Sequence, residues 1–347
     1  MKRVINYTVQ LKFLVENALF LLGGVSVFLY GLRLMSVNMQ KLAGKKMQAL
    51  LSRSTSSRIK GAAVGAAVTA VIQSSTAANV MLAGFVNAGA ISSAQAMAVV
   101  MGANVGTTIT AQLVSLSGNS LFNVTAAGSL VAFIGFLFSF SKKGGREAFG
   151  SALFGLGALF IGLEIMNGSV IALHGNDFFK RLFLAENPFV LVLNGLLITG
   201  VVQSSSAVSS VIILLARGGL IGFADGAYML LGTNIGAGIA VLLVGASMGS
   251  EAKKVAVANL LFNLVGTALF LPPMIAFESE ITAFFAQISG GIERQTANFH
   301  TVFNLASTLV LLPLASPFYK AVEFICKIKM PRLKRVKAGG KVKPAKV

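Results

Sequence analysis

The chain has 347 residues, of which 55% are hydrophobic and 12% are charged, and its mean hydropathy is +0.80. About a quarter of the residues of a soluble domain are charged, so this composition excludes that class and predicts an all-α integral membrane protein. The formal net charge of +18 comes largely from basic residues that gather in 38–60 and 320–347. Basic segments beside membrane spans bind anionic lipid headgroups, and because no basic motif is interleaved with aromatic residues we expect no nucleic-acid partner.

Seven apolar segments are long enough, at about 20 residues each, to cross the hydrocarbon of a bilayer. In chain order they cover residues 17–37, 95–117, 120–140, 148–172, 225–248, 255–275 and 299–319. Two further apolar segments, 61–91 and 188–218, are interrupted near the middle by a polar Gln-Ser-Ser cluster. We expect each of these two to form a re-entrant helical hairpin. Segments 95–117 and 225–248 contain Gly-x-Asn-x-Gly, which predicts helices that are broken at that point.

The two halves of the chain repeat each other. One constant offset of 130 residues aligns 13 identical residues between 65–106 and 195–236, whereas composition alone would give about four. We therefore expect two repeats, 1–147 and 148–275, each built from a span, a hairpin, a broken helix and a second span. An outer loop with the final span (276–319) and a basic cytoplasmic tail (320–347) complete the predicted organisation.

The distribution of charge predicts how the repeats are oriented. Residues 38–60, 141–147, 250–254 and the tail are basic and are expected in the cytoplasm, whereas the glutamates of 276–298 are expected outside. The first hairpin then enters the bilayer from the inside and the second from the outside, which is an inverted-topology repeat. The predicted location is the cell membrane, with a cytoplasmic C-terminus and a non-cytoplasmic N-terminus.

The polar clusters at membrane depth favour a binding site. Non-helical backbone is tolerated in a bilayer only where protein or a water-filled cavity satisfies its amides. Gln, Ser and Thr offer oxygens to a hard cation and N–H or O–H groups to an oxyanion. Any single Ser or Gly could instead serve helix packing. The Gln-Ser-Ser cluster and the Gly-x-Asn-x-Gly motif each occur twice at the same offset of 130 residues, however, and this duplication favours a binding site. With one cysteine, Cys326, and two histidines, His174 and His300, we expect no transition metal and no cofactor.

QSST (73–76) and QSSS (203–206) are followed, about thirty residues later, by GANVGTT (102–108) and GTNIGAG (232–238), and NFHTVFN (298–304) lies near the end. These paired motifs resemble those of the type II sodium-phosphate cotransporter family, and the resemblance covers roughly residues 15–320. It implies Na⁺-driven import of inorganic phosphate by alternating access. Both ions would be held near the bilayer midplane between the two hairpins.

The resemblance also implies roles for individual residues by position. The phosphate-binding residues are Ser74, Ser75, Thr76, Ser204, Ser205 and Ser206. The sodium-binding residues are Gln73, Asn104, Thr107, Thr108, Gln203, Thr233 and Asn234, and Na⁺ is the only metal expected. Ala237 and Gly238 stand where the second repeat would match Thr107 and Thr108, which weakens a cation site near Asn234.

Two alternatives stay open. The same fold can carry another anion, such as sulfate, arsenate or a carboxylate. An intramembrane serine hydrolase would need one serine with one general base, whereas the serines are duplicated here and His300 is not. The sequence does not predict the oligomeric state.

Arg33 and Glu164 occupy matching positions in GLRLM (31–35) and GLEIM (162–166). An inverted repeat directs these two side chains toward opposite faces of the membrane. We therefore expect each to reach the interface or to find a local partner, and not to pair with the other.

Overall fold

The computed structural model describes residues 2–53, 57–116, 123–173, 187–245 and 248–327. Within these ranges the protein is helical throughout and contains no strand, which confirms the all-α prediction. The helices are α1 (Lys2–Arg53), α2 (Arg58–Ile72), α3 (Ser75–Asn87), α4 (Ser93–Ser115), α5 (Val124–Ser139), α6 (Gly144–Leu173), α8 (Pro188–Val202), α9 (Ser205–Arg217), α10 (Phe223–Gly245), α11 (Ser250–Ala276), α12 (Glu278–Ile288), α13 (Ile292–Leu311) and α14 (Ala315–Lys327).

Among the described residues, five helices are long and apolar enough to cross a membrane: α4, α10, α11, residues 12–44 of α1 and residues 144–172 of α6. The bent pair α13 and α14 raises this number to six if it counts as one span. Seven spans were expected. The expected span 120–140 corresponds to α5, which has 16 residues, and the expected span 299–319 turns by 93° between α13 and α14. Pro313 lies in this turn, where its missing N–H cannot continue the helix.

Two segments that were expected as loops contain helix. Residues 38–60 were expected to form a basic loop, but α1 continues to Arg53 and α2 begins at Arg58. Residues 39–53 are rich in Lys, Met, Gln, Leu and Ala, whose helix propensity is high enough to extend a helix beyond an apolar span. The expected outer loop contains the amphipathic helix α12, and the basic tail begins within α14, whereas residues 328–347 lie outside the described ranges.

Each segment that carries a Gln-Ser-Ser cluster folds as two helices with a two-residue break. The first break separates α2 from α3, and the second separates α8 from α9. The sequence also fixes where these units begin. Ser57 caps α2, with its side chain accepting a hydrogen bond from the Lys60 N–H, and Asn187 caps α8, which starts at Pro188.

The prediction of broken helices in 95–117 and 225–248 is wrong, because α4 and α10 are continuous. Their glycines serve close packing instead of unwinding. A Cβ atom on Gly102 would lie 1.8 Å from the carbonyl oxygen of Ala62 in α2, and one on Gly232 would lie 1.8 Å from that of Val192 in α8. The backbones of α2 and α4, and of α8 and α10, therefore touch at matching places in the two halves.

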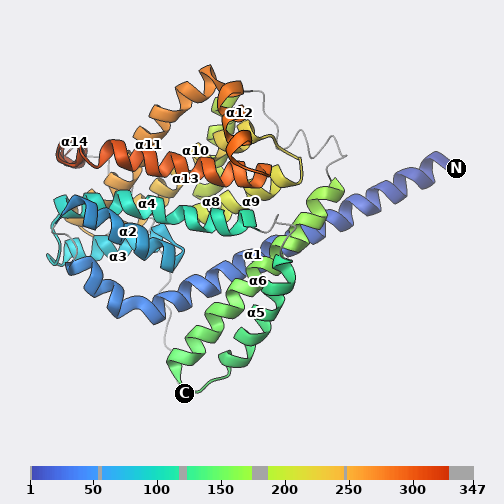
Figure 1. Cartoon of the computed structure of the whole chain (residues 1–347), viewed down its shortest axis with the longest axis horizontal. Coiled ribbons are helices and arrows are strands. Elements are labelled where there is room, and N and C mark those ends of the chain that lie inside the picture. Colours follow the sequence, from blue (N-terminus) through green and yellow to red (C-terminus); the bar gives the residue numbers. More distant parts are fainter. Residues whose placement is uncertain (1, 54–56, 117–122, 174–186, 246–247, 328–347) are drawn as a thin grey trace, which may run out of the picture.

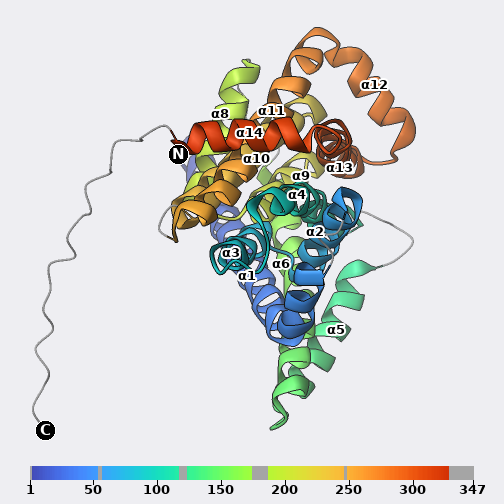
Figure 2. The same cartoon turned by 90° about the vertical axis from the view of Figure 1, so that its left-hand side faces the viewer.

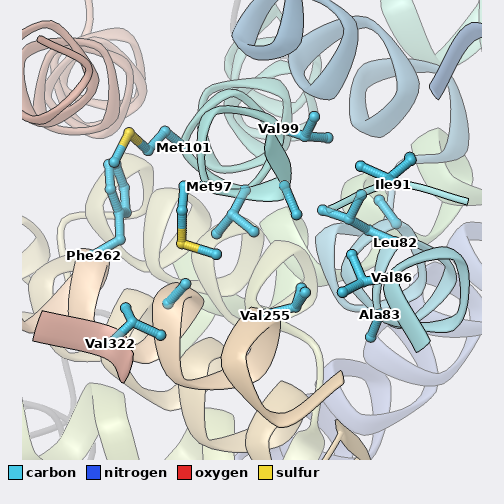
Figure 3. Close-up of a cluster of buried hydrophobic side chains, with 14 of the residues drawn as sticks. Leu82, Ala83, Val86, Ile91, Met97, Val99, Met101, Val255, Phe262 and Val322 are labelled. Atoms are coloured by element: carbon cyan, nitrogen blue, oxygen red, sulfur yellow. The ribbon is translucent and has the colours of Figure 1, made fainter. Parts of the chain in front are cut away.

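The two halves also pack across each other. Helix α4 contacts α9, and helix α10 contacts α3, so the long helix of each half lies against the second hairpin helix of the other. Side chains of α3, α4 and α11 form a buried apolar cluster beside this crossing (Figure 3), which includes Leu82, Val86, Met97, Met101, Val255 and Phe262. The crossing brings the ends of both hairpins toward one region.

Helices α1, α5 and α6 form a second group. Figures 1 and 2 show α5 and α6 reaching away from the remaining helices, with α1 crossing beside α6. Helix α1 packs on α6 through glycines: Cβ atoms added to Gly24 and Gly31 would collide with the backbone of α6. The buried residues Phe28, Leu32 and Met35 of α1 belong to an apolar cluster shared with α9. Helix α1 thereby connects the second group with the hairpins.

Candidate functional site

The two Gln-Ser breaks share one backbone geometry. Gln73 (φ 58°, ψ 28°) and Gln203 (φ 57°, ψ 23°) adopt the left-handed conformation, and in the described part of the chain no other non-glycine residue has a positive φ. In each break the Gln N–H donates to a threonine carbonyl, of Thr69 or Thr199, at 2.7 Å. This conformation costs an L-residue roughly 1–2 kcal/mol. Its occurrence at two matching positions indicates a shared constraint on function.

Helices α3 and α9 both begin with a serine cap directly after the break. The Oγ atom of Ser74 accepts a hydrogen bond from the Ala77 N–H at 3.2 Å, and that of Ser204 accepts one from the Ala207 N–H at 3.4 Å. Helix geometry leaves the N–H groups of the first-turn residues that follow each cap without a carbonyl acceptor. Such N-termini carry partial positive charge and favour an anion.

Both breaks open into one cavity of about 310 Å³. All eight residues of the two clusters, 73–76 and 203–206, line this cavity. Ser75 and Ser205 are each 6% exposed, so the cavity reaches into the protein interior. The structure thus brings together every predicted phosphate-binding residue and two of the predicted sodium-binding residues, Gln73 and Gln203.

One face of α1 forms a wall of this cavity. It contributes Leu29, Leu32, Arg33, Ser36 and Val37, and Arg33 is the one charged residue of the lining. The polar motifs did not predict this wall, and Arg33 was assigned to the interface or to a local partner. An available signal was that no other charged residue lies between Glu16 and Lys41.

The two glutamines differ in their side-chain contacts. The Gln73 Oε1 atom accepts a hydrogen bond from Thr110 Oγ1 of α4 at 2.6 Å, and its Nε2 atom donates to the Ala70 carbonyl. Ala240 occupies the position in α10 that matches Thr110. Gln203 is exposed, and its side chain has no hydrogen-bond partner among the described residues. The first break is therefore braced against its long helix and the second is not.

The five other predicted sodium-binding residues do not line the cavity. They are buried in α4 and α10, and they are Asn104, Thr107, Thr108, Thr233 and Asn234. The three threonine hydroxyls donate to carbonyls of their own helices. Asn104 Nδ2 donates to Asn259 Oδ1 of α11 at 2.9 Å, and Asn234 Oδ1 lies 3.4 Å from His300 Nε2 of α13. In this structure both asparagines contact neighbouring helices and neither lines the cavity.

Two matched pairs of buried polar groups flank the breaks and were missed from the sequence. Thr69, Thr199, Asn79 and Ser209 are each 0% exposed, and the Oγ1 atoms of the two threonines and the side chains of Asn79 and Ser209 have no hydrogen-bond partner among the described residues. The two members of each pair, Thr69 with Thr199 and Asn79 with Ser209, lie 130 residues apart, which is the repeat offset. A buried group left without a partner costs about 1–3 kcal/mol, so these atoms remain free to bond a further partner. The identity of Thr69 with Thr199 was the available signal.

The surroundings of His300 do not resemble a catalytic site. His300 is 1% exposed, its Nε2 atom lies near Asn234, and its Nδ1 atom has no hydrogen-bond partner in the described part of the chain. Over the described ranges, no group of three or more His, Cys, Asp or Glu side chains could hold a metal ion. The cavity therefore offers hydroxyl, amide and guanidinium groups, which bind ions and do not provide a general base.

Comparison with protein families gives a match to the Na⁺/Pi-cotransporter family over residues 27–168 and 170–293. The chain belongs to the Na⁺/Pi-cotransporter family. The resemblance drawn from the motifs is thus confirmed. Each of the two matched segments contains one Gln-Ser-Ser cluster. Membership of this family, together with the long apolar helices of the structure, identifies the protein as a multi-pass membrane protein.

Curated relatives align with most of this chain. The uncharacterized protein YqeW of Bacillus subtilis is 27% identical over 309 residues, which are 86% of this chain and 94% of that protein. The putative inorganic phosphate export protein YjbB of Escherichia coli K12 is 27% identical over 310 residues, which are 88% of this chain and 55% of that protein. The YjbB of Salmonella typhimurium is 26% identical over 300 residues. The chain spans about half the length of the YjbB relatives, and no solved structure matches it.

Proposed function

We propose that this protein is a Na⁺-coupled secondary transporter that moves inorganic phosphate through the cavity between the two Gln-Ser-Ser breaks. The observation that carries the proposal is the convergence of both breaks, with closely similar backbone geometry, on one cavity. Membership of the Na⁺/Pi-cotransporter family favours phosphate over sulfate, arsenate or a carboxylate. The absence of a base near the described serines disfavours hydrolysis.

In this proposal phosphate is bound by the first turns of α3 and α9. Ser74, Ser75, Thr76, Ser204, Ser205 and Ser206 supply hydroxyl and backbone N–H donors to its oxygens. Na⁺ is bound beside the phosphate, with the side-chain amide oxygens of Gln73 and Gln203 as ligands. The buried oxygens of Thr69 and Thr199 are further candidates, because they lack other partners. Asn104 and Asn234 act indirectly, by joining α4 to α11 and α10 to α13, whereas Thr107, Thr108 and Thr233 bond within their own helices.

Coupling between the ions follows from electrostatics. Phosphate carries more negative charge than a cavity at membrane depth can hold without compensation. Na⁺ in the same cavity compensates that charge, so each ion binds more tightly when the other is present. Neither ion alone then supports the transition that carries both.

The proposed mechanism is alternating access between two inverted repeats. Supporting observations are the repeat offset, the similar φ and ψ angles of the two breaks, and the reciprocal contacts of α4 with α9 and of α10 with α3. The cavity lies between the hairpins and α1, which belongs to the other helix group. Movement of these groups against each other would expose the cavity to one side and then to the other.

We propose import as the direction, because an inward Na⁺ gradient drives a symporter inward. Export is the second candidate, favoured by the name of the YjbB relatives, putative inorganic phosphate export protein. Both directions use the same cavity. Phosphate content of cells that express the protein, measured with phosphate in the medium, distinguishes them: import raises the content and export lowers it.

The test of the proposed function is uptake of radiolabelled phosphate into liposomes that contain the purified protein. We expect an inward Na⁺ gradient to accelerate uptake, and unlabelled phosphate to compete better than sulfate. Ser75→Ala and Ser205→Ala should each reduce uptake at least about tenfold, because each removes a donor to a charged ligand. Ser129→Ala on the exposed face of α5 is the matched control and should transport normally. Uptake that ignores Na⁺ in the wild type would contradict the proposal.

A further inference from the structure

The cavity has one cationic side chain, and it comes from neither Gln-Ser-Ser cluster. Arg33 lies on the face of α1 that lines the cavity, together with Ser36 one turn further along. The other lining residues are uncharged. The inference drawn from this arrangement rests on the proposed function and goes beyond the residues that the family motifs indicate.

Arg33 has no protein partner for its charge. Within the described part of the chain no carboxylate forms an ion pair with it, and its guanidinium makes no hydrogen bond. Glu164, at the matching position of the second repeat, accepts a hydrogen bond from Thr125 Oγ1 at 3.2 Å and does not line the cavity. An arginine within an apolar span is costly unless something compensates it. Arg33 is exposed and lines the cavity, so a ligand bound there can reach its guanidinium and compensate its charge.

We propose that Arg33 is the cationic partner of the bound oxyanion and gives the site its preference for a doubly charged anion. A guanidinium presents a rigid fork of N–H donors that matches two oxygens of a tetrahedral oxyanion. The helix N-termini of α3 and α9 supply only partial charges. Arg33 supplies a full charge, and with Na⁺ it balances the hydrogen phosphate dianion.

The position of Arg33 also gives the anion a role in conformational change. Neighbouring side chains of α1, Leu32 and Met35, are buried in the cluster that α1 shares with α6 and α9. The hydroxyl and N–H donors belong to the hairpins, whereas Arg33 belongs to the group of α1, α5 and α6. A bound dianion thus connects the two helix groups, and its departure leaves Arg33 without compensation.

The experiment compares Arg33→Gln and Arg33→Lys with Arg146→Gln, which removes an exposed charge at the start of α6. Phosphate uptake is measured in the liposome system over the pH range in which dihydrogen phosphate loses its second proton. In the wild type we expect the KM, expressed as total phosphate, to fall as the dianion becomes abundant. Arg33→Gln should raise the KM roughly ten- to hundredfold and abolish this pH dependence, because a charge-assisted contact is lost.

Arg33→Lys should restore the pH dependence with a KM between those of the wild type and Arg33→Gln. Arg146→Gln should behave like the wild type. A wild-type KM and pH profile in a monodisperse Arg33→Gln protein would overturn the inference and leave the proposed function intact. Loss of uptake in Arg33→Gln without rescue by Arg33→Lys would also overturn it, because a role in folding or packing would then explain the loss. Failure of the wild type to transport phosphate would instead refute the proposed function.

Discussion

At the scale of single residues, the two glutamines of the breaks occupy a conformation that glycine adopts more easily. Stability alone would therefore favour glycine at both positions. Gln203 makes this contrast clear, since its exposed side chain has no partner in the described structure that would offset the backbone strain. The proposed function accounts for the glutamine side chain, because its amide oxygen would be a ligand of Na⁺ in the cavity.

Substitution of Gln203 separates stability from transport. Gln203→Gly should keep or raise the thermal unfolding temperature in detergent, because glycine accepts positive φ without strain. Gln203→Val should lower the free energy of unfolding by about 1–2 kcal/mol, because a β-branched residue tolerates this conformation poorly. Both variants should lose Na⁺-dependent uptake. Normal uptake by Gln203→Gly would show that the side chain plays no part in the site.

The sequence predicted part of the site at this scale. The Gln-Ser-Ser residues were predictable because they are polar, duplicated and surrounded by apolar sequence. Thr69 and Arg33 carried a signal, the identity of Thr69 with Thr199 and the isolation of Arg33 between Glu16 and Lys41, but their role, like that of Asn79, depends on what surrounds them in space. A threonine within a helix normally bonds a carbonyl of its own helix, and only the coordinates show that Thr69 does not. The α1 wall was likewise invisible because it is distant in sequence from both clusters.

At the scale of helices, glycine determines how closely pairs approach. Gly65 and Gly102 bring α2 and α4 into backbone contact, and Gly195 and Gly232 do the same for α8 and α10. The sequence predicted both breaks and five of the seven expected spans, because hydropathy and interruption are local properties. It mispredicted breaks in α4 and α10, because a glycine that unwinds a helix and one that admits a neighbouring helix have the same local pattern.

Alanine at these glycines provides a test of the packing. Gly102→Ala and Gly232→Ala should each destabilise the protein by about 1–3 kcal/mol, because the added methyl group would overlap a carbonyl oxygen of the partner helix. Gly23→Ala is the control, since nothing lies within 4 Å of its Cβ position, and it should be neutral or stabilising by up to about 1 kcal/mol. Thermal unfolding in detergent measures the stability of these variants and of the control. Equal effects at the two kinds of position would contradict the close packing of these helices.

At the scale of the whole molecule, the proposal requires the two repeats to run in opposite directions through the bilayer. The charges of the connecting segments predict this orientation. Lys142 lies between α5 and α6, Ser279 lies in α12, and Lys320 lies in α14. All three are exposed. The positive-inside rule places Lys142 and Lys320 in the cytoplasm and Ser279 outside.

Single cysteines at these positions test the orientation in a Cys326→Ala background. In intact cells, a membrane-impermeant maleimide should label Ser279→Cys and spare Lys142→Cys and Lys320→Cys. Permeabilised cells should show labelling of all three, which controls for accessibility. Labelling of Lys142→Cys together with Ser279→Cys in intact cells would contradict the inverted arrangement.

The central claim is that one anion contacts both breaks at once. Calorimetric titration of phosphate into the purified protein in Na⁺ tests it most directly, with the wild type, Ser75→Ala, Ser205→Ala and the double variant. Two groups that bind the same ligand are energetically coupled, so the cycle should give an interaction free energy of at least about 0.5 kcal/mol. Effects that add within about 0.3 kcal/mol would mean that the two serines act at separate places, and would contradict the account.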